Sequence, residues 1–67
     1  MPYEIRVRGE LGESVAATFS GFEAEVEPAE TILRGQVRDN AELHALLERI
    51  ERLGLELVEV RQVGRQR

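Results

Sequence analysis

The chain is 67 residues long, carries a net charge of −4 at neutral pH and contains no cysteine. A domain of this size buries only about 60% of its unfolded surface, and no disulfide or thiolate metal site is available to support it. Association between copies is then the common remedy. The acidic balance argues against a dedicated binder of nucleic acid or of an anionic membrane.

The segment Tyr3–Arg8 alternates strictly between apolar and charged residues, which predicts a half-buried strand. This charged strand follows Met1 directly, without an apolar leader, and the apolar runs of the chain are too short to cross a membrane. We therefore expect a cytoplasmic protein with no membrane partner. Gly9 and Gly12 then predict a loop.

After this loop, apolar residues recur at roughly helical spacing, which predicts a short helix over residues 12–19 that ends before Gly21. Eight residues rich in Val, Thr and Ser also suit an irregular segment, and both interpretations stay open. The apolar positions are Leu11, Val15, Ala16 and Phe19.

Residues 22–27 and 30–37 alternate again, and the intervening Pro28-Ala29 predicts a two-residue hairpin turn because Pro sets φ there. Such a turn directs Ile32 away from the core, while Thr31 and the residues in phase with it face inward. The cross-strand pairs would be Glu27 with Glu30, Glu25 with Ile32, and Glu23 with Arg34.

A capped amphipathic helix is predicted over residues 40–53. Asp39 is a favourable N-cap, and Glu42 three residues later completes a capping box. Gly54 predicts a left-handed stop, after which Leu55 packs back on the last turn as in a Schellman motif. The apolar positions of one face are Leu43, Leu46, Leu47, Ile50 and Leu53.

The last predicted strand, residues 56–62, changes the phase of its apolar positions between Leu57 and Val58. Either Leu57 or the pair Val58 and Val60 would face outward, unless a β-bulge intervenes. The sequence leaves this choice open.

The predicted order is strand, helix, strand, strand, helix, strand. Both helices would cover one face of a four-stranded antiparallel sheet, which is the α+β, ferredoxin-like βαββαβ arrangement. Right-handed crossovers place the first and fourth strands side by side and the second strand at an edge. We expect one domain over residues 1–63, followed by a frayed basic tail at 64–67.

Four stretches resemble a set of short uncharacterised bacterial proteins typical of GC-rich actinobacteria. They are Leu33-Arg34-Gly35, Val37-Arg38-Asp39, Leu43-His44 and Leu53–Arg61. The resemblance covers nearly the whole chain, and it implies no catalytic role.

The chain is also similar to small regulatory domains of the ACT type, in its element order and in the glycines of its first strand–helix loop. This looser likeness implies a site for a small metabolite between that loop and a neighbouring subunit. The residues of this candidate ligand loop are Gly9, Glu10, Gly12 and Glu13. The same loop is a poor clamp for nucleic-acid backbone, because Glu10 would repel phosphate.

His44, the single histidine, is predicted on the flank of the second helix with Glu48 one turn later. These two residues would supply two ligands of a surface metal site, but no third ligand is evident. We favour a solvated or interface histidine, and we predict no metal, no cofactor and no catalytic residue.

Two charged groups on the strands are interpreted as structural. Alternate glutamates on one strand lie about 6.5–7 Å apart, too far to share one calcium ion, and we read them as protection of an exposed edge. They are Glu23, Glu25 and Glu27. Arginines of adjacent strands are interleaved with glutamates, which favours a mixed ion-pair surface over an anion site. They are Arg6, Arg8, Arg34 and Arg61.

An outward apolar strip on the open sheet face, rimmed by Arg and Glu, is typical of a subunit interface. We expect a non-catalytic interaction or assembly module, forming a homo-oligomer through its open sheet face or an edge strand, with itself or another protein as partner. The alternatives are the ACT-like regulatory domain and a cofactor-free enzyme, which the mostly apolar inner face disfavours. The predicted interface residues are Ile32, Arg34, Leu57, Glu59 and Arg6.

Overall fold

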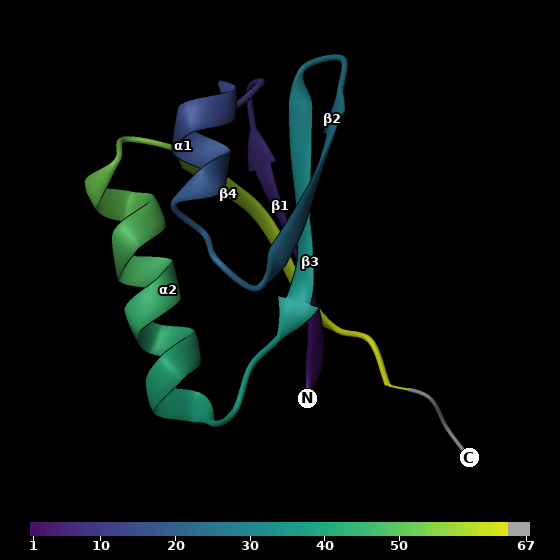
Figure 1. The fold of residues 1–67 in the computed structure, drawn as a ribbon, viewed down its shortest axis with the longest axis vertical. Coiled ribbons are helices and arrows are strands. Elements are labelled where there is room, and N and C mark those ends of the chain that lie inside the picture. Colours follow the sequence, from purple (N-terminus) through teal and green to yellow (C-terminus); the bar gives the residue numbers. More distant parts are fainter. Residues whose placement is uncertain (65–67) are drawn as a thin grey trace.

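The computed structural model describes residues 1–64, so all of the predicted basic tail except Gly64 lies outside the described residues. Six elements follow one another in the predicted order: β1 (Pro2–Arg8), α1 (Glu13–Ala17), β2 (Phe22–Glu27), β3 (Glu30–Gln36), α2 (Asn40–Arg52) and β4 (Glu56–Gln62). The four strands form one antiparallel sheet in the order β2-β3-β1-β4, with both helices on the same face (Figure 1). The predicted ferredoxin-like βαββαβ fold is confirmed.

The β2–β3 hairpin has the predicted register. Glu23 lies opposite Arg34, and Glu25 lies opposite Ile32. The two-residue turn requires a left-handed backbone at Ala29, whose φ is 69°. The Ala29 carbonyl also accepts a hydrogen bond of 2.8 Å from the Gly9 amide. The turn is therefore tied to the loop that follows β1.

The first helix is confirmed but is shorter than predicted. It begins at Glu13 after a Gly12 N-cap that supplies no side-chain hydrogen bond, and it ends at Ala17. Thr18 donates its hydroxyl to the Val15 carbonyl at 2.7 Å, and its amide bonds the same carbonyl at 3.1 Å. These i to i+3 bonds tighten the last turn and end the helix before residue 19.

Both predicted caps of α2 are present. The Asp39 carboxylate accepts from the Glu42 amide at 2.9 Å. The Glu42 carboxylate accepts from the Arg38 amide at 2.6 Å, one residue before the position that a standard capping box uses. At the other end, Gly54 has φ of 79°, and the Leu55 amide donates to the Ile50 carbonyl at 3.2 Å, as in a Schellman motif.

A β-bulge in β4 settles the phase of the last strand. Leu57 lies opposite Val7 and Val60 lies opposite Ile5, while the register shift between these pairs leaves Val58 as the extra residue. Because Ile5 and Val7 belong to the core, Leu57 and Val60 both lie on the helical face. Of the alternatives that the sequence left open, the bulge is the one observed, and Leu57 does not lie on the open face where the predicted interface needed it.

The core fills the space between the sheet and the helices. α2 contributes two buried side chains, and the loop after α1 contributes a buried phenylalanine. The buried members of this cluster are Ile5, Val7, Leu11, Phe19, Leu33, Leu46 and Ile50.

Candidate functional site

On the open face of the sheet, Glu4 forms salt bridges with two arginines. Arg34 Nε donates to Glu4 Oε2 at 2.8 Å, and Arg61 Nη2 donates to Glu4 Oε1 at 2.8 Å. The Arg34 hydrogen bond, followed by that of Arg61, lowers the pKa of the Glu4 carboxyl below its usual value. Arg34 also donates to Glu25 at 2.5 Å, and this hydrogen bond lowers the pKa of Glu25. One carboxylate thus links three strands, because its two partners lie on β3 and β4.

A second set of contacts continues across the same face. Arg6 on β1 contacts Glu30 on β3 at 3.1 Å and Glu59 on β4 at 3.5 Å. Arg8 contacts Glu56 at 2.9 Å. All four arginines of this face therefore have carboxylate partners within the chain. The contacts favour the mixed ion-pair surface over a site for an external anion.

Ile32 lies on this open face but is not available as the centre of an exposed strip. Its cross-strand neighbours are Arg6 and Glu25, and its exposed fraction is 1%. The aliphatic stems of long charged side chains cover apolar surface in this way. The expectation of an uncovered Ile32 is therefore wrong, although its predicted outward direction agrees with the register.

The predicted interface residues divide between the two faces of the sheet. Arg6, Arg34 and Glu59 share the open face with Ile32. Leu57 lies on the opposite, helical face because of the bulge. A single apolar strip of Ile32 and Leu57 does not form.

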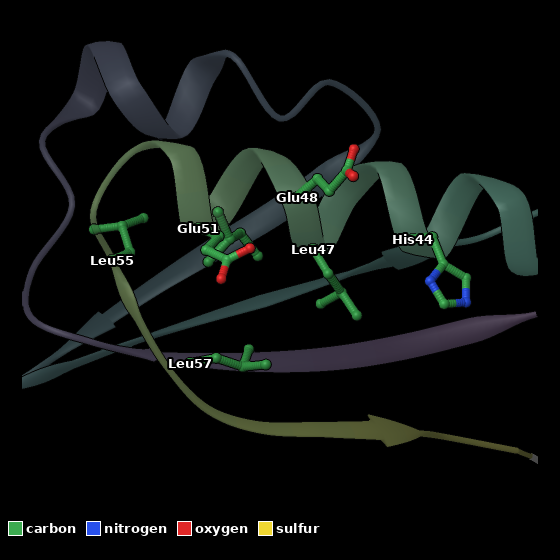
Figure 2. A pocket seen from close by; sticks show the side chains of 7 residues that line it. His44, Leu47, Glu48, Glu51, Leu55 and Leu57 are labelled. Carbon is green, nitrogen blue, oxygen red and sulfur yellow. The ribbon is translucent and has the colours of Figure 1, made fainter.

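A groove of about 420 Å³ lies between α2 and β4 (Figure 2). Its apolar walls come from the helix, from the turn after it and from the start of β4, and acidic side chains of the helix stand at its rim. In Figure 2 the Leu47 and His44 side chains point toward the sheet, whereas Glu48 points away from it. The lining residues are His44, Leu47, Glu48, Ile50, Glu51, Leu55 and Leu57.

His44 is exposed at one end of this groove. Within residues 1–64, no three His, Asp or Glu side chains gather closely enough to hold a metal ion. His44 and Glu48 are therefore two potential ligands without a third beside them among the described residues, and we assign them no metal.

The buried side chain of Thr31 hydrogen-bonds the backbone of the candidate ligand loop, a role that the sequence did not reveal. The buried Thr31 hydroxyl accepts from the Leu11 amide at 3.1 Å and donates to the Gly9 carbonyl at 2.8 Å. Glu10, Gly12 and Glu13 are exposed. Thr31 was predicted only to face inward, and a small polar residue in an otherwise apolar inner row was the available signal. A metabolite at this loop stays a prediction.

The two edges of the sheet differ in chemistry. Along the β2 edge, Glu23, Glu25 and Glu27 alternate with apolar residues, as the sequence predicts for a protected edge. The β4 edge carries two consecutive exposed apolar side chains beside the groove, Leu57 at 43% and Val58 at 40% exposure, whereas the β2 edge has one large exposed apolar side chain, Val26 at 51%. The sequence named Val58 together with Val60 as a candidate outward pair, and the bulge separates the two, because Val60 lies on the helical face opposite Ile5.

No helix within residues 1–64 has both the length and the apolar character needed to span a membrane. The search of curated proteins and the search of solved structures found no match to this chain. The model of one protein family matches residues 2–61, nearly the full length. The chain therefore belongs to the family described as "Domain of unknown function (DUF8691)".

Proposed function

We propose that this domain is a non-catalytic assembly module, most simply a homodimer, that associates through the free edge of β4. The observation that carries the proposal is the pair of consecutive exposed apolar residues, Leu57 and Val58, on an edge strand next to the groove between β4 and α2. An unpaired edge offers backbone donors and acceptors to another chain, and neighbouring apolar side chains make that pairing favourable.

The open sheet face supports association less well than the β4 edge. Ile32, the apolar residue at the centre of the predicted strip, is already covered, and the arginines of this face already contact carboxylates of the same chain. Packing a second sheet on this surface would remove many charges from water, and that desolvation commonly exceeds the Coulombic gain. Of the two association modes expected from the sequence, we therefore propose the edge strand.

The size of the core supports the same proposal. The described residues bury nine hydrophobic side chains, and one of them, Ile32, lies outside the helical layer. A core this small supplies only a few kcal/mol of stability, roughly 3–5 at most for chains below 80 residues. Pairing β4 with a second copy would bury Leu57 and Val58 and so add apolar burial where the domain lacks it.

The test compares the same substitution on the two edges. Val58→Glu alters the β4 edge, and Val26→Glu alters the β2 edge at a valine with similar exposure, 51% against 40%. Absolute mass is measured by light scattering on a sizing column, with circular dichroism to verify folding. We expect a dimer for the wild type and for Val26→Glu, and a folded monomer for Val58→Glu. A monomeric wild type, or dissociation caused only by Val26→Glu, would refute the proposal.

A further inference from the structure

We propose a specific register for this dimer, an inference that rests on the proposed function. Two copies of β4 pair antiparallel about a two-fold axis that passes between Val58 and Glu59. Glu56 of each copy then lies opposite Arg61 of the partner subunit, and Leu57 lies opposite the partner's Val60. The result is one continuous eight-stranded sheet with the helices of both copies on the same side.

The bulge is what makes this register possible. Directly opposite residues of an antiparallel pair share a face of the sheet, and in a regular strand residues three or five apart face opposite ways. Leu57 and Val60 are three apart, yet they lie opposite Val7 and Ile5 and share the helical face. The bulge at Val58 has shifted the alternation by one residue.

Glu56 and Arg61 show the same shift on the open face. They are five residues apart, yet Glu56 contacts Arg8 and Arg61 contacts Glu4, and both of these partners lie on that face. Each half of β4 therefore presents one charged residue on the open face and one apolar residue on the helical face, at matching distances from the point between Val58 and Glu59. Under a two-fold rotation the strand becomes complementary to itself.

Charge across the sheet supports the same register. Two rows of directly opposite residues run from β2 to β4 on the open face. The first row is Glu23, Arg34, Glu4 and Arg61, and the second is Glu27, Glu30, Arg8 and Glu56. The first row ends at the β4 edge with a cation, and the second ends there with an anion. The proposed register joins these two ends, so charge alternates through the seam from Glu23 of one copy to the partner's Glu30.

Competing registers satisfy fewer of these conditions. Shifting the partner by one residue sets Glu59 opposite its own copy, which places like charges together. Centring the axis on Val60 pairs Glu59 with the partner's Arg61, but it matches faces only on the C-terminal side of the bulge. Leu57 would then meet Val63, which follows the opposite phase. A bulge commonly protects an edge from indiscriminate pairing, and here it leaves one register that uses the whole strand.

Cysteine cross-linking tests the register cleanly, because the chain contains no cysteine of its own. The double variant Glu56→Cys/Arg61→Cys is oxidised at a concentration where light scattering measures the wild-type mass. Opposite Cα atoms of an antiparallel pair lie roughly 4.5–5.5 Å apart, within the range for a disulfide. Within one chain the two positions are separated by five residues, roughly 16 Å, which no disulfide spans. We expect a covalent dimer that reductant converts back to single chains.

Three controls separate the possible outcomes. The single variants Glu56→Cys and Arg61→Cys should stay unlinked, because neither residue meets its own copy in this register. The double variant Glu59→Cys/Arg61→Cys reports the register centred on Val60 and should also stay unlinked. A native dimer in which only this last variant cross-links would overturn the register and leave the assembly proposal intact. A monomeric wild type removes both proposals together.

Discussion

Glu4 and Arg34 lie directly opposite each other on β1 and β3, and Arg34 Nε donates to Glu4 Oε2 at 2.8 Å. The side chain of Glu4 is only 8% exposed, which is unusual for a carboxylate in a chain of this size. Its two arginine partners explain how this burial is tolerated, because each carboxylate oxygen accepts a charge-assisted hydrogen bond. Glu4 thus anchors the open face by its charge.

The first prediction concerns pH. Hydrogen bonds from Arg34 and then Arg61 lower the folded-state pKa of Glu4 below the ordinary 4.5, so in this range the unfolded chain binds more protons. The stabilisation is fully present above about pH 4.5 and is lost as the pH falls through the folded-state pKa. We expect Glu4→Gln to lower Tm at pH 7 and the difference from the wild type to shrink at pH 3.

Thermal melts followed by circular dichroism across this pH range provide the measurement. Glu10→Gln, in the exposed loop after β1, is the matched control and should leave Tm unchanged throughout. A difference between Glu4→Gln and the wild type that stays constant from pH 7 to pH 3 would contradict the assignment of the effect to the charged form of Glu4.

The second prediction concerns the buried hydroxyl of Thr31. Thr31→Val keeps the shape of the side chain but leaves the Leu11 amide and the Gly9 carbonyl without this partner. Unsatisfied buried polar groups cost about 1–3 kcal/mol, so we expect the free energy of unfolding to fall by that amount. Urea denaturation measures it.

Thr31→Ser is the control for Thr31→Val, because it removes a methyl group and retains both hydrogen bonds. It should cost about 1 kcal/mol, the amount typical of one buried methyl group. If Thr31→Ser destabilises the chain more than Thr31→Val does, packing of the methyl group matters and the loop is not held by the hydroxyl.

Local signals allowed the sequence to predict most of the fold. Asp39 and Gly54 bracket α2 because cap chemistry involves residues close in sequence. The hairpin register follows from the length of its turn and from the alternation on either side. These features require no knowledge of which distant segment lies alongside.

The features that the sequence left open or did not predict depend on distant neighbours. The bulge that places Leu57 and Val60 on one face is a property of the pairing between β4 and β1. The burial of Ile32 depends on side chains contributed by the two adjacent strands. A periodic pattern assigns each residue to a face, but it does not report whether long charged side chains then cover that face.

The third prediction concerns Gly35, where β3 passes under an aromatic ring. A Cβ atom at this position would lie 2.7 Å from the Phe22 ring and 2.7 Å from the Gly21 carbonyl oxygen. Both neighbours are firmly placed, because Phe22 packs against the core and Gly21 contributes backbone. We therefore expect Gly35→Ala to lower the free energy of unfolding by about 1–3 kcal/mol, as overpacking typically does.

Gly64→Ala is the control for this substitution, because a Cβ atom there meets nothing within 4 Å and Gly64 is not among the glycines with positive φ. It should change stability by no more than about 0.5 kcal/mol, the usual range for surface substitutions. Urea denaturation of both variants gives the comparison. Equal stability of Gly35→Ala and the wild type would show that the Phe22 ring moves aside at little cost.

The last prediction concerns the hairpin turn, where Ala29 has φ of 69°. A left-handed backbone costs a residue with a Cβ atom roughly 1–2 kcal/mol, and glycine avoids that cost. Glycine adds conformational freedom to the unfolded chain, which offsets about 0.4–1 kcal/mol of the gain. We expect Ala29→Gly to raise the free energy of unfolding by about 0.5–1 kcal/mol, whereas Ala17→Gly in α1 should lower it by about 1 kcal/mol. Urea denaturation at one protein concentration measures both changes, and the expected opposite signs distinguish backbone strain from glycine flexibility. A loss of stability in both variants would mean that glycine flexibility outweighs backbone strain at the turn.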